Sequence, residues 1–456
     1  MAKVKPSIPK GTRDFAPATM VKREYIFDTI KKVFKKYGFQ PLETPSMENI
    51  STLTGKYGEE GDKLLFRILN SGDYLSKATE DDLLSRDLKV LTPKISNKGL
   101  RYDLTVPFAR FVVQHRGEIT FPFKRYQIQP VWRADKPQKG RYREFYQCDV
   151  DVIGSDSLIN EVELIKIIDE VFTALNLKVT IKINNRKVLK GLADYLESSD
   201  KFTDITIAVD KLDKIGIEGV KEDLKKRGIN ESAVEKIDSF LRLEDNNLSE
   251  TKKSLQEIFS GIPAGEKGIE ETEEIFNFLE SVELKNEVEF DPKLARGLDY
   301  YTGTIFEVKA REIEIGSICG GGRYDDLTGV FGLNDVSGVG ISFGAERIFD
   351  VMEKLDKFPE GMQSLSKILF VNFGKEEVKH ALKYIQVLRD NDIPAVLYPD
   401  TAKMKKQFSY ADNLNIKYVA IVGQDEIKND RITLKNMETG EQSNLTLDEL
   451  INKLSY

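Results

Sequence analysis

Histidine is almost absent from this sequence, whose 456 residues include only His115 and His380. Sites that gather several histidines around a metal ion, or that pair a histidine with a serine or cysteine nucleophile, therefore have few residues to draw on. Most chemistry of that kind is excluded. We expect any catalysis to depend mainly on Arg, Gln, Asp, Glu and Tyr side chains.

Cysteine is equally rare. Cys148 and Cys319 lie far apart in the sequence, and neither belongs to a CxxC pair. This spacing indicates neither a disulfide framework nor a zinc site. The pattern is typical of a protein in a reducing compartment, and we expect a cytoplasmic location.

Long apolar segments are missing as well. No hydrophobic run approaches the roughly 20 residues needed to cross a bilayer. The segment of residues 1–10 is basic overall, but it lacks the apolar stretch of an export signal. We expect no membrane association. The net charge of −7 argues against a surface coated in positive charge, although local basic patches can still bind nucleic acid.

The length is enough for two or three domains, and 40% of the residues are hydrophobic, which allows each domain a sizeable core. Charged helical patterns without an obvious catalytic cluster fill residues 184–279, including 186–196 and 220–243. The other elements expected before residue 357 are helices at 21–36, 106–115 and 345–355 and strands at 39–44, 99–102, 123–133, 145–154, 298–310 and 336–343.

The pattern changes after Pro359 and Gly361, which interrupt the preceding helix and mark a boundary. Beyond them, strands alternate with helices. We expect strands at 368–373, 395–398 and 418–422 and helices at 376–391 and 404–414. This alternation indicates a compact α/β domain with a mainly parallel sheet.

The most informative stretch is VWRADKPQKGRYREFYQCDVD, residues 131–151. Its central part holds five basic residues against two acidic ones, between two strand-like segments. The pattern predicts a hairpin whose long connection presents cations. A solvated surface loop is the alternative, but Arg133 directly follows an apolar strand, so we expect its side chain to be held in place. An arginine fork can bind two phosphate oxygens at once.

Three further stretches combine glycine with polar side chains. In LARGLDYYTGTIFEV, residues 294–308, Tyr300 and Tyr301 should point to opposite sides of a strand, so that at most one reaches a given ligand and the other is a core residue. In GSICGGGRYDDL, residues 316–327, three glycines permit positive φ and close main-chain contact with a ligand. This run is neither a Walker loop nor a GxGxxG turn, and an ordinary turn is the alternative.

The last stretch, GVGISFGAER at residues 338–347, places Gly or Ser at every second position and then an arginine. On a strand these small residues share one face and leave it flat. Such a face suits a purine lying over the sheet with phosphates near Arg347. Tight packing against another backbone is the alternative.

Taken in order, these stretches resemble the class II aminoacyl-tRNA synthetases and, among them, the histidine–tRNA ligases (histidyl-tRNA synthetases). WRADKPQKGRYREFYQ resembles the second motif of the class and GISFGAERI the third. Residues 21–45 resemble the first motif, which forms the dimer interface in the class. ARGLDYYTGTIFEV and GGGRYDDL resemble the two histidine-specific segments.

The resemblance implies an α+β fold with an antiparallel-sheet catalytic domain, a mostly helical insertion and a C-terminal α/β anticodon-binding domain. The implied bounds are 1–183 and 286–356 for the two parts of the catalytic domain, 184–285 for the insertion, 357–366 for a linker and 367–456 for the anticodon-binding domain.

The resemblance also assigns roles by position. Arg133 and Arg296 are the implied catalytic residues at the α-phosphate of ATP, and Arg141 and Arg347 would hold the outer phosphates. Within the histidine site, Asp103 and Thr105 would contact the amino group, and two tyrosines would contact the imidazole. The implied histidine-binding residues are Asp103, Thr105, Gln147, Asp151, Arg296, Tyr300, Tyr301 and Tyr324.

The implied reaction joins histidine to ATP and then to the 3′ end of tRNA(His), in a homodimer. No protein nucleophile is required, because catalysis is positioning and charge stabilisation. Mg²⁺ would accompany ATP; its ligands are not indicated, with Glu307 only one candidate. The C-terminal segment containing Lys403, Lys405, Lys406, Phe408 and Tyr410 would suit RNA bases, a solvated helix face being the alternative.

Two other interpretations remain. A regulatory relative that keeps the fold and binds histidine or RNA without catalysis would share the same architecture. Such relatives tend to lose the C-terminal domain or the motif arginines, whereas this sequence retains Arg133 and Arg347. A different class II synthetase, for threonine or proline, is the second interpretation, and the RGLDYYTGT segment argues against it.

Overall fold

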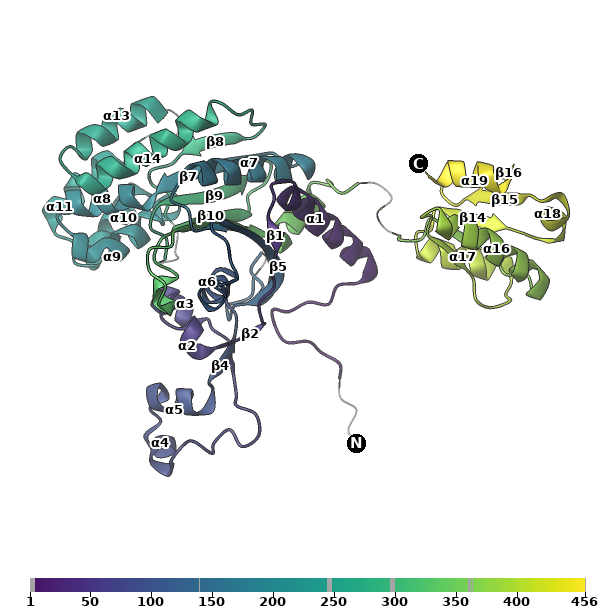
Figure 1. Ribbon diagram of the computed structural model, residues 1–456, viewed down its shortest axis with the longest axis horizontal. Coiled ribbons are helices and arrows are strands. Elements are labelled where there is room, and N and C mark those ends of the chain that lie inside the picture. Colours follow the sequence, from purple (N-terminus) through teal and green to yellow (C-terminus); the bar gives the residue numbers. More distant parts are fainter. Residues whose placement is uncertain are drawn as a thin grey trace. The chain divides into compact units, whose positions relative to one another are not determined.

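A computed structural model describes residues 5–138, 140–243, 248–295, 300–359, 362 and 364–455. The chain divides into two compact units (Figure 1). The first comprises Met1–Asp14 with Ile26–Lys357, and the second comprises Phe15–Tyr25 with Phe358–Tyr456. Among the described residues, no helix is both long and apolar enough to span a membrane.

An eight-stranded, mostly antiparallel sheet forms the centre of the first unit. Its order is β1-β5-β6-β11-β10-β9-β7-β8, and only the outer pairs β1–β5 and β7–β8 are parallel. The strands are β1 (Gln40–Pro41), β5 (Phe123–Trp132), β6 (Glu144–Ile153), β7 (Val179–Asn185), β8 (Glu287–Phe290), β9 (Thr304–Ala310), β10 (Cys319–Tyr324) and β11 (Gly338–Gly344).

One face of this sheet is apolar and packs against helices. Phe343 of β11 lies 5.9 Å from Phe34 of α1 (Pro17–Lys36) and 5.6 Å from Phe172 of α7 (Ile159–Ala174), measured between ring centroids. Helix α15 (Ala345–Lys354) follows β11 directly and contacts β6. Because side chains alternate along a strand, the opposite face of β5, β6 and β11 is left for polar residues.

A second, three-stranded sheet with the order β2-β4-β3 lies beside the central sheet. Between β3 and β4 the chain leaves the body of the unit and returns, forming the projection that carries α4 and α5 in Figure 1. The elements here are β2 (Met47–Asn49), α2 (Ile50–Leu53), α3 (Gly58–Lys63), β3 (Arg67–Ile68), α4 (Glu80–Ser85), α5 (Leu88–Ile95), β4 (Lys98–Leu100) and α6 (Thr105–Gln114); a short 3₁₀ helix, η2, spans Gly329–Phe331.

The segment between β7 and β8 is helical and has its own buried core. Residues 220–243 contain parts of three helices rather than one, because Gly228, at φ = 78°, turns the chain after α10. The helices are α8 (Arg186–Tyr195), η1 (Ser199–Lys201), α9 (Phe202–Val209), α10 (Leu212–Lys226), α11 (Glu231–Lys236), α12 (Asp238–Leu241), α13 (Leu248–Ile258) and α14 (Pro263–Leu279).

The second unit contains a five-stranded sheet with the order β13-β12-β14-β15-β16. The prediction of a mainly parallel sheet is only half right: β13, β12 and β14 are parallel, but β15 and β16 continue the sheet antiparallel. The elements are β12 (Ile368–Phe370), α16 (Lys375–Asp390), β13 (Ala395–Leu397), α17 (Met404–Asn413), β14 (Tyr418–Ile421), α18 (Gln424–Asn429), β15 (Ile432–Asn436), β16 (Gln442–Leu445) and α19 (Leu447–Leu454).

The contact between α8 and α14 gives a stability prediction. Gly191 lies directly against the backbone of Gly265, and a Cβ at position 191 would overlap the Cα of Gly265. We expect Gly191→Ala to lower the free energy of unfolding of the helical insertion by about 1–3 kcal/mol, the usual cost of overpacking. Urea denaturation measures this. Gly117→Ala is the control, because a Cβ there meets nothing within 4 Å; equal stability of both variants would contradict the close contact.

Candidate functional site

A cavity of about 480 Å³ opens over the polar face of the central sheet. Its walls come from the β5–β6 connection, the start of α6, the turn before β9, the β10 and β11 strands and the start of α15. Its volume lies within the range of small-molecule sites. Residues brought together here are separated by up to 290 positions in the sequence, from Tyr57 to Arg347.

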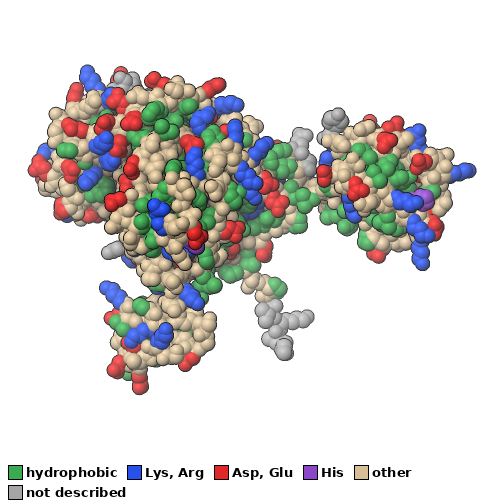
Figure 2. Space-filling view, viewed as in Figure 1, with side chains coloured by type: hydrophobic (Ala, Val, Ile, Leu, Met, Phe, Trp, Pro, Cys, Tyr) green, Lys and Arg blue, Asp and Glu red, His purple; other side chains and the backbone are tan. Residues whose placement is uncertain are grey.

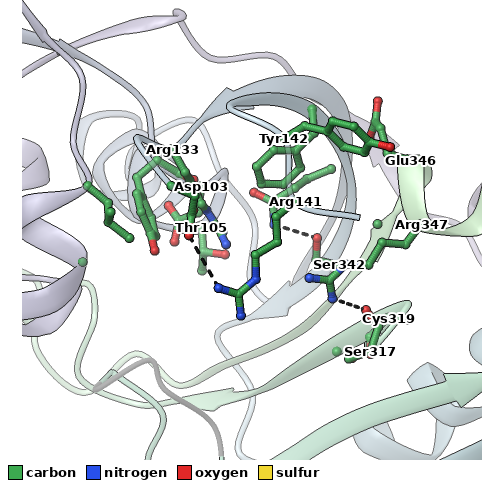
Figure 3. Close-up of a pocket in the computed structure, with 18 of the residues that line it drawn as sticks. Asp103, Thr105, Arg133, Arg141, Tyr142, Ser317, Cys319, Ser342, Glu346 and Arg347 are labelled. Atoms are coloured by element: carbon green, nitrogen blue, oxygen red, sulfur yellow. Dashed lines mark hydrogen bonds and ion pairs between the residues drawn. The ribbon is translucent and has the colours of Figure 1, made fainter. Parts of the chain in front are cut away.

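Three arginines surround this cavity (Figure 3). Arg133, at the end of β5, donates its Nε to the carbonyl of Tyr102 at 3.1 Å and lies over the Tyr102 ring. Arg347, in the first turn of α15, donates Nη1 to the Ser317 carbonyl at 2.6 Å. Arg141 lies between them in Figure 3, and its side chain is 55% exposed. Two of the three cations are thus held by main-chain carbonyls, and Arg141 lies 3.9 Å from the carboxylate of Asp135.

Asp103 is the centre of a hydrogen-bond group in the same cavity. Its Oδ1 accepts from the hydroxyl of Tyr57 at 3.0 Å and from the main-chain N–H of Val106 at 3.1 Å. Its Oδ2 accepts from the Tyr300 hydroxyl at 3.2 Å. Burial raises the pKa of the Asp103 carboxyl, while the Val106 N–H and the Arg133 charge oppose the rise. These donors fix the carboxyl in position.

The floor of the cavity is a polar stripe along β6. Gln147, Asp149 and Asp151 occupy alternate positions, so their side chains share one face. On the neighbouring strand, Ser342 pairs with Asp149 in the antiparallel register, and Gly340 pairs with Asp151. Gln147 donates Nε2 to the Ser342 hydroxyl at 2.8 Å, while its buried Oε1 has no hydrogen-bond partner among the described residues.

Asp151 of this stripe forms a buried ion pair with Arg125 on the neighbouring strand. Arg125 of β5 is completely buried, and its Nη2 is 2.7 Å from Asp151 Oδ2. The other oxygen of Asp151 accepts from the Tyr324 hydroxyl at 2.7 Å. A Cβ at Gly340 would overlap the Asp151 carboxyl, so the glycine is required for this arrangement. Gly340 therefore packs closely against the Asp151 carboxyl. The predicted flat strand face under a purine does not include this contact.

The structure places the predicted ligand-binding residues in two connected groups. Arg133, Arg141, Arg347, Asp103, Thr105, Gln147, Tyr300 and Tyr301 line the cavity. Asp151 and Tyr324 line a small pocket that shares Thr105, Tyr301, Gly320 and Ser342 with it. The predicted Arg296 lies outside the described residues.

Two expectations about this region are wrong. Tyr300 and Tyr301 do not diverge across a strand, because they precede β9 in a turn; their rings are 4.9 Å apart and both line the cavity. The glycine run at 320–322 does not adopt positive φ but forms the buried strand β10. Side chains are excluded there because a Cβ at Gly321 or Gly322 would overlap the neighbouring strands.

Glu307 is not among the residues that line the cavity; it lies on β9, 3.6 Å from Lys309. The cavity contains other carboxylates that sequence reasoning missed, Asp135 and Glu346. Within the described ranges, no group of three or more His, Cys, Asp or Glu residues could hold a metal ion.

Asp149 is the most informative of the missed residues. Its side chain is 2% exposed, and burial raises its pKa to about 7, with Arg125 opposing the rise and Asp151 adding to it. The polar residues at every second position from Gln147 to Asp151 could have indicated Asp149 as a site residue. Its pairing with Ser342 could not be predicted without the strand register.

The raised pKa gives a testable pH dependence. A carboxyl whose pKa is higher in the folded state than in the unfolded state destabilises the fold above that pKa, and the effect fades as the pH falls towards the unfolded value near 4. We expect Asp149→Asn to stabilise the ligand-free protein at pH 8, by at most about 4 kcal/mol, and much less at pH 5. Chemical denaturation at both pH values tests this; a pH-independent difference would contradict it.

Comparison with known proteins places the chain in one family. A family model described as histidyl-tRNA synthetase matches residues 69–348, and an anticodon binding domain model matches 367–455. The chain is 58% identical over 451 residues to a histidine–tRNA ligase of Bacteroides fragilis, covering 99% of both chains, and 57% identical to one of Christiangramia forsetii, covering 98% of both.

Solved structures agree. The crystal structure of histidyl-tRNA synthetase from Nostoc superimposes with a TM-score of 0.83 at 31% identity, covering 99% of each chain. A protein of Bacillus halodurans, described as an ATP phosphoribosyltransferase regulatory subunit/histidyl-tRNA synthetase, shares the fold at a TM-score of 0.70 and 20% identity over 90% of this chain and 97% of the other. The chain belongs to the histidyl-tRNA synthetase family, within the class II aminoacyl-tRNA synthetases.

Proposed function

We propose that this chain activates L-histidine with ATP, forming histidyl-adenylate and pyrophosphate, and then transfers histidine to the 3′ end of tRNA(His). The observation that carries the proposal is a single cavity that three arginines line together with carboxyl, amide and tyrosine groups. The arginines suit the triphosphate of ATP, and the other groups suit an amino acid with a polar ring. Near-full-length identity of 52–58% to histidine–tRNA ligases supports it.

In the first step, a carboxylate oxygen of histidine forms a bond to the α-phosphorus of ATP, and the bond from that phosphorus to the pyrophosphate oxygen breaks. Arg133 would hold the α-phosphate, because its guanidinium lines the cavity and is fixed by Tyr102. Arg141 and Arg347 would hold the outer phosphates. Fixed charges of this kind stabilise the developing negative charge without reorganisation. Arg296 stays a prediction of the sequence for the same phosphate.

Recognition of histidine would use the opposite side. Asp103, Thr105 and Gln147 would contact its amino group, for which Gln147 Oε1 offers an unpaired buried acceptor. Asp151, Tyr300, Tyr301 and Tyr324 would surround the imidazole ring. Buried polar groups of this kind reject amino acids that cannot hydrogen bond to them.

ATP would bind together with Mg²⁺, which neutralises phosphate charge. Asp135 and Glu346, two carboxylates that line the cavity with Arg141 and Arg347, would fit an ion held mainly by phosphate oxygens. Glu346 Oε2 already accepts from the main-chain N–H of Tyr146 at 2.9 Å, which fixes its position. The adenine ring would lie over β11 between Ser342 and Gly344, where side chains are small.

The second unit would bind the anticodon of tRNA(His). Lys375, Lys379 and Lys383 are exposed on α16 at spacings of four, which places them on one side of the helix. Figure 2 shows basic side chains gathered over this part of the unit. Lys403, Lys405 and Lys406 are also exposed, at the start of α17, and Phe408 is half-buried beside them. Such positive charge suits a phosphate backbone, and aromatic rings suit stacked bases.

A regulatory protein that binds histidine or RNA without catalysis is the alternative, and it has less support. Similarity to regulatory subunits alone would favour it, but the Bacillus halodurans protein described in part as a regulatory subunit is only 20% identical and shares the fold alone. We also retain, as proposals, the homodimer, the cytoplasmic location and the domain bounds 1–183, 184–285, 286–356, 357–366 and 367–456.

The activity is tested by ATP–pyrophosphate exchange with each amino acid. We expect exchange with histidine only, and we expect Arg133→Met to reduce it by on the order of 10²–10³-fold, because a fixed charge at the transition state is lost. Arg311→Met is the matched control, since Arg311 pairs with Glu287 away from the cavity. Exchange with no amino acid would favour the regulatory alternative.

The homodimer is tested by sedimentation equilibrium at micromolar concentration. Residues 21–45, which include most of α1 and strand β1, resemble the dimer motif of the class. We expect a mass near twice the chain's 51.8 kDa. A single species at the monomer mass would contradict the proposal.

A further inference from the structure

Residues 9–14, which we call the N-terminal segment, lie against the connection between β5 and β6. The carbonyl of Gly11 accepts from the main-chain N–H of Arg143 at 2.8 Å, and the carbonyl of Lys10 accepts from Nη1 of the same arginine at 3.3 Å. Nε of Arg143 donates to the carbonyl of Asp135 at 3.1 Å. Arg143 therefore links the two sides of the connection to each other and to the N-terminal segment.

Gly11 allows this segment to approach the connection closely. Its φ is +91°, a conformation that residues with a side chain rarely adopt. A Cβ at this position would lie 2.9 Å from Cγ of Arg143 and 2.9 Å from Cγ of Pro137. The Thr12 hydroxyl donates to the carbonyl of Pro9 at 2.8 Å and closes the turn around the glycine. The local fold thus holds the N-terminal segment in one position on the connection.

Arg13 extends from this segment to two residues that line the cavity. Its guanidinium carbon is 3.4 Å from the centre of the Tyr142 ring, and its Nη2 is 3.9 Å from Oε1 of Glu346. Figure 3 shows Tyr142 and Glu346 on the same side of the cavity. The Tyr142 hydroxyl in turn donates to Asp350 of α15 at 3.2 Å. Arg13 therefore contacts both the β5–β6 connection and the first turn of α15.

These two elements carry cations of the cavity. Arg141 precedes Tyr142 on the connection. Arg347 follows Glu346 on α15, and its Nε donates to the carbonyl of Gly140 at 3.0 Å. The connection and the helix thus already meet at one point beside the cavity. A second contact that fixes one element against the other also fixes the distance between their cations.

We propose that Arg13 is a positioning residue for ATP. Its cation, held over the Tyr142 ring, keeps the β5–β6 connection against α15, so that Arg141 and Arg347 can bind the outer phosphates together. The electron-rich face of an aromatic ring attracts a cation in this geometry. Groups held in place before a ligand arrives bind it without a further cost of ordering. The inference rests on the proposed function and adds a residue outside the cavity lining.

Arg13→Met removes the charge and keeps most of the side-chain stem. We expect it to raise the KM for ATP in histidine-dependent pyrophosphate exchange roughly 5- to 30-fold, the equivalent of a lost cation–π contact. The KM for histidine should stay within about threefold of the wild-type value. Lys5→Met is the matched control, because it removes an exposed cation earlier in the chain. An equal rise of both KM values, or lower stability to urea with both KM values unchanged, would overturn the proposal.

A double-mutant cycle identifies the partner of Arg13. Tyr142→Phe keeps the ring, whereas Tyr142→Leu removes it. Because the effects of contacting residues are not additive, the effect of Arg13→Met on the KM for ATP should persist in the Tyr142→Phe protein and largely disappear in the Tyr142→Leu protein. An undiminished effect in the Tyr142→Leu protein would contradict the role of the ring.

Gly11→Ala tests the same segment without a change of charge. We expect a higher KM for ATP and an unchanged KM for histidine, because the added Cβ displaces the segment from the connection. Gly72→Ala is the control: Gly72 has a φ of +77°, but a Cβ there meets nothing within 4 Å. Equal KM values for ATP in the two glycine variants would count against the inference. Absence of histidine-dependent exchange in the wild type would instead remove the proposed function, which is a distinguishable result.

Discussion

The fully buried charge of Arg125 is the constraint on which the arrangement of the pocket depends. A guanidinium without solvent must be paired, and its partner here is Asp151 at 2.7 Å, with Gln127 Oε1 at 3.2 Å. The pair fixes the Asp151 carboxyl against Gly340, where any side chain would overlap it. The same carboxyl receives the Tyr324 hydroxyl. One ion pair thus determines a glycine on β11 and the position of a tyrosine on β10.

The cavity brings positive and negative groups close together. Arg133, Arg141 and Arg347 line it with the carboxyl groups of Asp103, Asp135 and Glu346, and Asp149 and Asp151 line the adjoining small pocket. An amino acid with a cationic amino group and a nucleotide with anionic phosphates would each find groups of opposite charge here, which would orient the two relative to each other. Orientation of this kind brings the carboxylate of the first to the phosphorus of the second.

The resemblance to the class II synthetases predicts the antiparallel catalytic sheet, and the charged helical patterns of residues 184–279 predict the helical insertion. The motif arginines could be placed around one ligand only through that resemblance. Other features depend on tertiary structure: Tyr300 and Tyr301 share a cavity because a turn overrides strand alternation. The partners of Arg125 and Asp149 depend on the register of β5, β6 and β11, which no local pattern specifies.

The central claim is that one cavity holds histidine and the nucleotide together. A crystal structure with 5′-O-(N-L-histidyl-sulfamoyl)adenosine, a stable mimic of histidyl-adenylate, tests it most directly. We expect the sulfamoyl group beside Arg133, adenine over β11 and the imidazole ring directed towards the polar face of β6. Binding of the analogue outside this cavity, or with its imidazole turned away from β6, would contradict the account.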